Sequence, residues 1–380
     1  MWGVEIVNAM WSRRALLAAS RAVVAAACAS VLPASAQAPA AVRSASGRIR
    51  LAGNENPHGP GPAARAAIAA ATGDSWMYPI AEEMAFKAQI AEREGLTPRH
   101  VLIGAGSSEI LHLAAIVYGL GQGELVTAAP TFSLTADHGR AVGASVREIP
   151  LDADLRHDLR AMAAAVSPKT RLIYVCNPNN PTGTMVTGTE LNEFIATTAG
   201  RATVLVDEAY LEFLPDAAAH SAVARVHAGD NVIIARTFSK LHGLAGLRIG
   251  YALARPDIIE GLARLRLTAP SSLGLAAAAA SYTDAAFQAS SRQSIAEARA
   301  ITLTALDDLG LRYAPTAVNF VFFDTGRPVG EFIAAMRERG FSLGRPFAPY
   351  QTWCRVSMGT VAQMRAFDQA LRSHYASPAQ

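Results

Sequence analysis

Five short apolar runs, several of them followed directly by polar or glycine-rich sequence, constrain the fold of this chain more than any other feature. They lie at 101–103, 125–127, 172–176, 204–206 and 232–235, and most are rich in β-branched residues. Helical patterns alternate with them. Because uninterrupted apolar strands are typical of a sheet covered by helices on both faces, we expect an α/β protein. Ligands of such sheets bind beyond the carboxyl ends of the strands.

A second, smaller α/β domain is expected toward the C-terminus. An alanine-rich helical stretch follows residue 265, and then come a strand at 319–323 and a helix at 329–339. We therefore divide the chain after its first 36 residues into an N-terminal arm at 37–77, a large domain at 78–265 and a small domain at 266–380. A hydrophobic fraction of 51% over 380 residues suffices for two packed lobes.

The charge balance argues against a nucleic-acid partner. The chain has 34 basic and 31 acidic residues, and no dense stripe of Lys and Arg occurs in it. Nucleic-acid binding depends on such a stripe or patch. We therefore expect small-molecule partners and no nucleic acid.

Residues 1–36 have the pattern of a twin-arginine export signal. An arginine pair at 13–14 precedes an apolar stretch at 22–32, and small residues at 34–36 match a cleavage site. We therefore expect cleavage near Ala36 and a periplasmic protein without stable membrane association after processing.

The sequence leaves open the start position, the processing of the signal and the state of the cysteines. The chain could start at Met1 or at Met10, and lipidation at Cys28 is an alternative to simple cleavage. Cleavage would leave Cys176 and Cys354, which are too few for a disulfide framework. The two cysteines are either two buried free thiols or the two halves of one disulfide bond.

One lysine stands out because the chain has almost none. Only Lys87, Lys169 and Lys240 occur, and the third lies in Thr-Phe-Ser-Lys-Leu-His-Gly-Leu-Ala-Gly-Leu-Arg at 237–248. A lysine amine can form an imine with an aldehyde, whereas arginine stays protonated. The neighbouring hydroxyls and Arg248 would suit a phosphate. This segment therefore predicts pyridoxal 5'-phosphate (PLP), held covalently at one end and ionically at the other.

Two glycine-containing turns follow predicted strands. Gly-Ala-Gly-Ser-Ser-Glu at 104–109 precedes a helix, so its backbone N–H groups could approach an anion closely. Asn-Pro-Asn-Asn-Pro-Thr-Gly at 177–183 is expected to be a rigid turn that presents the Asn180 amide.

Two further motifs carry charges. Asp-Glu-Ala-Tyr at 207–210 places a carboxylate at the end of a strand, where it could pair with a protonated pyridine nitrogen and keep the ring electron-accepting. Tyr210 could donate a hydrogen bond to the ring oxygen. Near the C-terminus, Arg355 and Arg345 could each bind a carboxylate or phosphate through paired hydrogen bonds.

Taken together, these motifs resemble those of the class I/II aminotransferases, the fold type I group of PLP-dependent enzymes. The most similar branch is that of the histidinol-phosphate aminotransferases, and the similarity spans residues 51–360. The resemblance implies a large domain with a mostly parallel seven-stranded sheet flanked by helices, and a smaller α/β C-terminal domain.

The resemblance also implies residue roles. Lys240 would bind the cofactor and move the substrate proton, Asp207 would hold the ring nitrogen, and Tyr210 would bind the ring oxygen; these three are the candidate catalytic residues. Asn180 would share the ring oxygen and Phe132 would stack on the ring. The phosphate would contact glycine, hydroxyl and arginine positions, namely Gly106, Ser107, Ser108, Thr237, Ser239 and Arg248, together with Tyr78 of the neighbouring subunit in a homodimer.

The candidate substrate-binding residues come from both ends of the chain. The resemblance implies that Arg355 binds the acid group of the substrate and aligns Arg345 with a second anion-binding arginine. Asn-Glu-Asn at 54–56, that is Asn54, Glu55 and Asn56, matches the N-terminal substrate segment of the family. His58 follows this segment where histidinol-phosphate aminotransferases usually have tyrosine. No metal site is expected.

The expected activity is transamination with alternating half-reactions at one site, which should give ping-pong kinetics. The amino group would move between an amino acid, or an amine like histidinol phosphate, and a 2-oxo acid. A PLP-dependent amino-acid decarboxylase of the same fold is an alternative, because the bond that breaks depends on substrate orientation. An exported binding protein without catalysis is an alternative of another class. The motifs leave the donor, the acceptor and the pathway open.

Overall fold

A computed structural model describes residues 47–376 of the chain. The export signal predicted at 1–36 lies outside the described residues, together with Cys28 and both alternative start positions. Those expectations therefore stay predictions.

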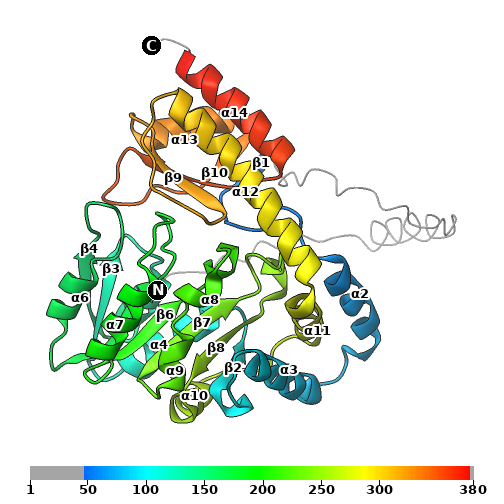
Figure 1. The fold of residues 1–380 in the computed structure, drawn as a ribbon, viewed down its shortest axis with the longest axis vertical. Coiled ribbons are helices and arrows are strands. Elements are labelled where there is room, and N and C mark those ends of the chain that lie inside the picture. The colour runs from blue at the N-terminus through cyan, green and yellow to red at the C-terminus, as the bar shows by residue number, and fades with distance from the viewer. Residues whose placement is uncertain (1–46, 377–380) are drawn as a thin grey trace, which may run out of the picture. The chain divides into compact units, whose positions relative to one another are not determined.

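The larger lobe is built on one sheet of seven strands in the order β2-β8-β7-β6-β5-β3-β4. Only β8 runs antiparallel to its neighbours, so the remaining six strands point in one direction (Figure 1). The predicted α/β fold with a mostly parallel seven-stranded sheet is confirmed. The strands are β2 (Val101–Gly104), β3 (Glu124–Ala129), β4 (Ser145–Pro150), β5 (Thr170–Cys176), β6 (Thr203–Asp207), β7 (Val232–Thr237) and β8 (Gly250–Ala254).

Helices cover both faces of this sheet, which explains the uninterrupted apolar runs. Side chains alternate along each strand: Val204 and Val206 of β6 join the core on one face, whereas Leu205 joins the core on the other. The first face is covered by α2 (Pro62–Ala71), α3 (Ile80–Arg93), α6 (Leu159–Ala165), α7 (Gly188–Thr198), α9 (Val223–His227) and α11 (Ser272–Thr283). The second is covered by α4 (Ser107–Gly119), α5 (Leu134–Ala141) and α10 (Pro256–Ala263), while the short α8 (Ala217–His220) follows β6.

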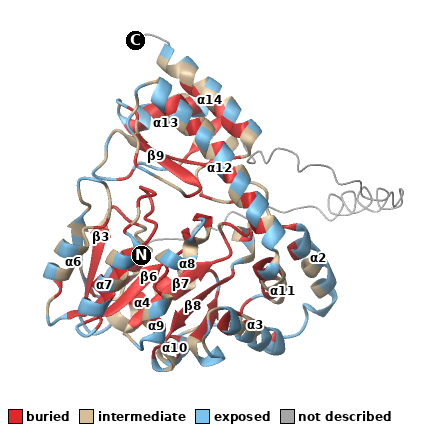
Figure 2. Ribbon diagram, viewed as in Figure 1, coloured by how far each residue is buried: buried red, intermediate tan, exposed pale blue. Residues whose placement is uncertain are grey.

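The smaller lobe has its own core and two short sheets. In one, β9 (Phe320–Asp324) pairs antiparallel with β11 (Trp353–Ser357), and in the other β1 (Ile49–Leu51) pairs parallel with β10 (Phe341–Leu343). The N-terminal arm therefore contributes a strand to the C-terminal lobe. The helices of this lobe are α12 (Ala285–Asp308), α13 (Val329–Glu338) and α14 (Val361–Ala376). Figure 2 shows buried residues concentrated on β9 and on the strands of the large sheet.

The predicted elements agree with the observed ones to within a few residues. The strand predicted at 319–323 is β9, which begins and ends one residue later, and the helix predicted at 329–339 is α13, which ends one residue earlier. The alanine-rich stretch after 265 forms α11 and α12. Sequence analysis missed β4, whose residues are mostly half-buried or exposed at the sheet edge, and β8.

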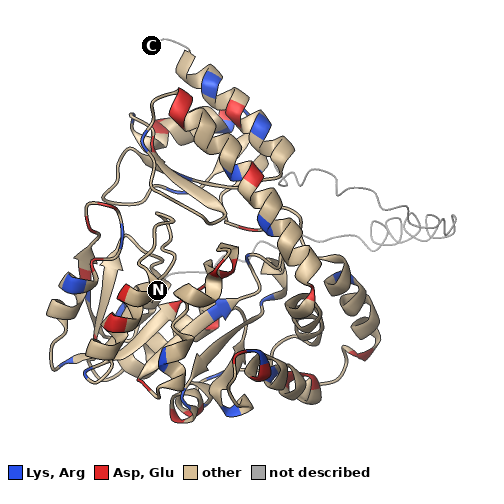
Figure 3. Ribbon diagram, in the orientation of Figure 1, with Lys and Arg blue, Asp and Glu red and all other residues tan. Residues whose placement is uncertain are grey.

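The surface carries charges of both signs side by side, as Figure 3 shows for α12 and α14. Within residues 47–376, no helix combines the length and the hydropathy needed to cross a membrane.

Candidate active site

The parallel strands bring the predicted motifs to one edge of the large sheet. Asp207 ends β6, the turn at 177–183 follows β5, and Lys240 follows β7. The turn at 104–109 follows β2, which points the same way as these three strands. The carboxyl ends of these strands therefore meet, as the strand pattern predicts.

Most of the predicted site residues line one cavity of about 250 Å³ at this edge. Lys240 and Asp207 both face it, so the two groups on which a PLP site depends share one space. The other predicted residues in its wall are Asn54, Glu55, Ser107, Ser108, Phe132, Asn180, Tyr210, Thr237, Ser239, Arg248 and Arg355.

Asp207 is a buried carboxylate held in a fixed orientation. Its Oδ2 accepts a hydrogen bond from the Tyr174 hydroxyl at 3.0 Å, and its Oδ1 accepts one from the backbone N–H of Ala209 at 3.1 Å. Burial raises the pKa of Asp207 to about 6, although both hydrogen bonds oppose that shift. A cationic group on the cavity side would restore the ionised form and be held by it.

Lys240 enters the same cavity with an unusually acidic ammonium group. Its Nζ donates to the backbone carbonyl of Gly53 at 3.2 Å and lies 5.4 Å from the centre of the Tyr210 ring. Burial, followed by the nearby Arg355 charge, lowers the pKa of Lys240 to about 8. A substantial minority of the amine is therefore neutral near pH 7, and neutral amine is the nucleophilic form.

Arg248 joins the loop after β2 and the loop after β7, and the three together form a cup for an anion. Its Nη2 donates to the carbonyl of Ala105 at 3.1 Å, and its Nη1 donates to Ser239 Oγ at 3.3 Å. Gly106, at φ 82°, passes so close that an added Cβ would lie 2.5 Å from Arg248 Nη2. Only glycine fits there. The cup contains the N-terminus of α4, whose unpaired N–H groups favour an anion.

Arg355 on β11 is the cavity residue that comes from the smaller lobe. Its Nη1 donates to Asn180 Oδ1 and its Nη2 to the carbonyl of Ala52, both at 2.5 Å. The guanidinium also lies over the rings of Phe320 and Phe347. Arg355 thus connects the small lobe to the Asn180 turn, and a substrate acid group would replace or share these contacts.

Asn54 links the arm to Tyr210. Its Nδ2 donates to the Tyr210 hydroxyl at 3.0 Å, and its Oδ1 accepts from Ser357 Oγ at 2.6 Å. Asn54 adopts a left-handed backbone conformation at φ 54°, which asparagine tolerates better than most residues. The arm therefore holds the tyrosine that resemblance assigns to the ring oxygen.

Besides Gly106, which lies next to Arg248, three predicted site residues do not line the cavity. Tyr78 is 86% exposed. Asn56 is buried beside the cavity, where its amide donates to Leu241 O at 2.7 Å and to Ser291 Oγ at 3.1 Å. Arg345 stacks on Phe347 and donates to Pro346 O. In addition, His58 hydrogen-bonds Ser294 at 2.8 Å and is not part of the wall.

Sequence reasoning missed several residues of the site. Tyr174 supports Asp207, and Cys176, two residues further along β5, lines the cavity. The available signal was their period-two spacing, which places both on one face of the strand that ends at the Asn180 turn. Cys176 and Cys354 are both free thiols. Gly53 contributes a backbone carbonyl, for which the side-chain pattern gives no signal.

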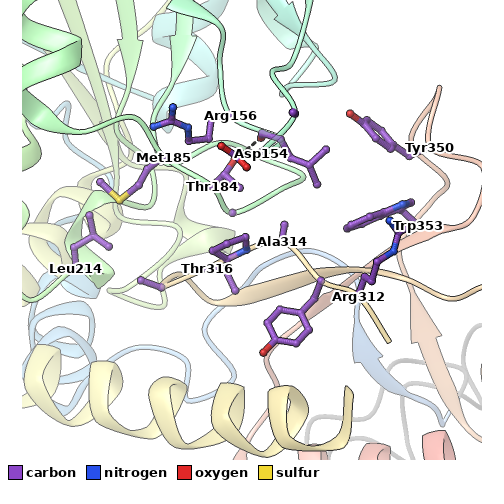
Figure 4. A pocket seen from close by; sticks show the side chains of 16 residues that line it. Asp154, Arg156, Thr184, Met185, Leu214, Arg312, Ala314, Thr316, Tyr350 and Trp353 are labelled. Atoms are coloured by element: carbon purple, nitrogen blue, oxygen red, sulfur yellow. Dashed lines mark hydrogen bonds between the residues drawn. The ribbon is translucent and has the colours of Figure 1, made fainter. Parts of the chain in front are cut away.

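A larger cavity of about 1050 Å³ lies elsewhere and contains none of the predicted site residues. Figure 4 shows Arg156, Thr184 and Met185 on one side of it and Tyr350 and Trp353 on another. Size alone would favour this cavity. The smaller one is assigned as the active site because the convergent charged groups with shifted pKa values line it.

Comparison with known proteins identifies the group to which this arrangement belongs. The family described as "Aminotransferase class I and II" matches residues 46–371. The chain belongs to this family. The histidinol-phosphate aminotransferase of Moorella thermoacetica is 39% identical over 330 residues, which cover 85% of this chain and 84% of that protein. Histidinol-phosphate aminotransferase 2 of Ralstonia nicotianae is 38% identical, with 86% and 88% covered.

A solved structure agrees with this assignment. The histidinol-phosphate aminotransferase of Sinorhizobium meliloti, crystallised with PLP, superposes with a TM-score of 0.80 at 30% identity, over 87% of this chain and 91% of that one. The predicted resemblance is confirmed, and this aminotransferase uses PLP. The residues of this chain fit the cofactor. The buried carboxylate of Asp207, the lysine with a lowered pKa (Lys240) and the anion-binding cup at Arg248 all face one cavity.

The shifted pKa of Lys240 gives a testable pH dependence for loading the aminotransferase with PLP. Covalent attachment to the apoprotein is expected to accelerate about tenfold from pH 6 to pH 7 and about fivefold from pH 7 to pH 8, and to level off above, because only the neutral amine would react with the aldehyde. Stopped-flow absorbance would measure this rate. Arg355→Gln should move the plateau to higher pH, since Arg355 helps to depress the pKa. A rate that is constant between pH 6 and pH 8 would contradict the assigned state of Lys240.

Proposed function

We propose that this aminotransferase takes its amino group from a donor whose acidic group binds Arg355, with histidinol phosphate as the first candidate. The observation that carries the proposal is the position of Arg355 in the cavity wall with Lys240 and Asp207. The names of the 39% and 38% identical relatives support this donor. Amino acids are the other donors to compare, because a guanidinium binds carboxylate and phosphate alike.

Three cavity residues would have defined parts in amino transfer. When bound, PLP supplies a carbonyl carbon for the amino group and a ring that accepts electron density from the donor's Cα. Asp207 keeps the ring nitrogen protonated, while Arg355 orients the donor by its acid group. Lys240 Nζ accepts the proton from Cα, and its lowered pKa suits it to take up and release that proton near neutral pH.

A single-turnover comparison of donors tests this function. The PLP-loaded enzyme is mixed with histidinol phosphate or with one of a panel of amino acids, without any acceptor. We expect the matching donor to give one equivalent of carbonyl product and an aminated cofactor, as ping-pong transfer requires. Release of carbon dioxide from an amino acid without a keto product would instead identify the decarboxylase.

Arg355→Gln is expected to raise KM for the preferred donor by about 10- to 100-fold, because a buried charge-assisted contact to the acid group is lost. Since this contact is made before and during the reaction, kcat should change less than KM. Steady-state kinetics would measure both. Arg365→Gln, at an arginine of α14 whose side chain is 69% exposed, serves as the control and should leave KM unchanged. An unchanged KM in Arg355→Gln would remove Arg355 from donor binding.

We infer that the enzyme works as a homodimer in which Tyr78 reaches the neighbouring site. Tyr78 lies in an exposed apolar patch formed by Trp76, Met77, Tyr78, Ile80 and Met84, with exposed fractions from 45% to 86%. Patches of this kind are typical of protein interfaces. An exposed tyrosine that does not line its own cavity supports a contact with a second subunit.

A mixed dimer gives a sharp test of this arrangement. A hybrid of Tyr78→Ala and Lys240→Ala subunits contains one site with both residues intact, if Tyr78 acts across the interface. Hybrids isolated with two different tags should then regain about half of the native activity. Hybrids no more active than half of the Tyr78→Ala homodimer would contradict the inference.

We also propose that the protein is exported through its twin-arginine signal and matures near Ala36. The support is the sequence pattern of residues 1–36. Replacing both Arg13 and Arg14 by lysine should abolish periplasmic accumulation of a shortened protein, as measured by fractionation and N-terminal sequencing. Full-length protein found solely in the cytosol of the native host would refute export.

A further inference from the structure

A buried histidine behind the active site has contacts that the proposed chemistry does not use. His157, between β4 and α6, is 4% exposed, and its Nε2 lies 3.1 Å from Oδ1 of Asn179. Its Nδ1 is buried and has no hydrogen-bond partner among residues 47–376. Burial of an unpaired ring nitrogen costs free energy, so the presence of a histidine at this position calls for a functional or structural explanation.

The hydrogen bonds of Asn179 fix which nitrogen of His157 carries the proton. Asn179 Nδ2 donates to the carbonyl of Pro130 at 3.2 Å and to Thr182 Oγ1 at 3.0 Å. Its Oδ1 accepts from Thr131 Oγ1 at 2.7 Å and therefore faces His157 as an acceptor. Nε2 of His157 must then be the donor. Burial lowers the pKa of His157 to about 4, so the ring stays neutral in this tautomer.

Asn179 joins the two chain segments that would hold the cofactor ring. Thr131 precedes Phe132, and Asn179 precedes Asn180; both Phe132 and Asn180 line the active-site cavity. The loop that carries His157 contacts the same turn a second time, because Leu155 O accepts from Thr184 Oγ1 at 2.5 Å. The Asn179 amide therefore connects the segment that carries Phe132 with the turn that carries Asn180.

We propose that His157 is a positioning residue for the cofactor site: its Nε2–H locks the Asn179 amide, which fixes the neighbouring Phe132 and Asn180, the residues that would stack on the PLP ring and bind its oxygen. The inference rests on the proposed roles of Phe132 and Asn180. His157 touches neither cofactor nor substrate, and its effect passes through Asn179. Loss of the donor leaves a buried acceptor with one fewer partner and frees the turn to shift.

His157→Leu removes the donor, and His157→Gln restores an N–H at a similar distance from the backbone. We expect His157→Leu to weaken PLP binding about tenfold and to lower the visible circular dichroism per bound cofactor by at least about half, since that signal reports a ring held in one asymmetric orientation. His157→Gln should recover most of both. His374→Leu, the same change at a half-buried histidine of α14, should behave like the native enzyme.

A second variant separates positioning from a general loss of stability. Thr131→Val removes the other donor to Asn179 Oδ1 with little change in shape, and it should reduce the visible signal in the same direction. Unchanged ellipticity per bound cofactor in His157→Leu would overturn the proposal. If His157→Leu does not fold, unchanged ellipticity in Thr131→Val would overturn it. Failure of the PLP assignment itself would be recognised separately, because native protein would then show no cofactor band.

Discussion

Replacement of Lys240 by alanine is expected to lower kcat for amino transfer by about 10⁴-fold or more. The variant would lose both the amine proposed to bind the cofactor covalently and the base proposed to move the Cα proton. Single-turnover kinetics with the preferred donor would measure the loss. Binding of PLP should weaken but persist, because the Arg248 cup and Asp207 remain.

The two other lysines provide matched controls for this change. Lys87→Ala and Lys169→Ala make the same substitution in residues that do not line the cavity, and both should keep turnover near the native level. A small primary amine such as methylamine, added to Lys240→Ala, should restore part of the proton transfer. Full turnover in Lys240→Ala would refute the enzyme mechanism.

Asp207→Asn is expected to reduce kcat by about 10²- to 10³-fold, because the amide keeps the shape of the side chain but cannot stabilise a protonated ring nitrogen. The Tyr174 hydroxyl can still donate to the remaining oxygen, so the fold should be retained. Stopped-flow measurement of Cα proton removal would isolate the affected step. Donor KM should change little, since Asp207 is assigned to the ring nitrogen and Arg355 to the acid group of the donor.

Asp257→Asn is a suitable control for this prediction. Asp257 lies in the first turn of α10, with 65% of its side chain exposed, and pairs with Arg255 outside the site. Its loss should leave kcat unchanged. If Asp207→Asn remained within about threefold of native kcat, the role of a charged partner for the ring nitrogen would be wrong.

The large lobe and the residues that meet in its cavity could be predicted from sequence, because each strand and the polar residues that follow it are adjacent in the chain. The run at 204–206 predicts a buried strand, and Asp207 follows it directly, so strand direction alone places the carboxylate at the sheet edge. The same holds for Asn180 after β5 and Lys240 after β7. Residue order along the chain then fixes which groups meet.

Contacts between distant segments could not be predicted in this way. Asn54 reaches Tyr210 and Ser357 only because β1 joins the small lobe through β10, a pairing of two three-residue strands with little pattern of their own. His157 belongs to none of the sequence motifs, and only the fold places it against Asn179. Backbone groups such as the Gly53 carbonyl leave no trace in the side-chain pattern.

Borohydride reduction of the PLP-loaded native enzyme, followed by peptide mapping, tests the central claim most directly. With three lysines in the whole sequence, a reduced pyridoxyl group can be assigned without ambiguity. We predict one equivalent of stable adduct on the peptide that contains Lys240, and none on those with Lys87 or Lys169. An adduct confined to another lysine, or native enzyme that turns over without any adduct, would contradict this account.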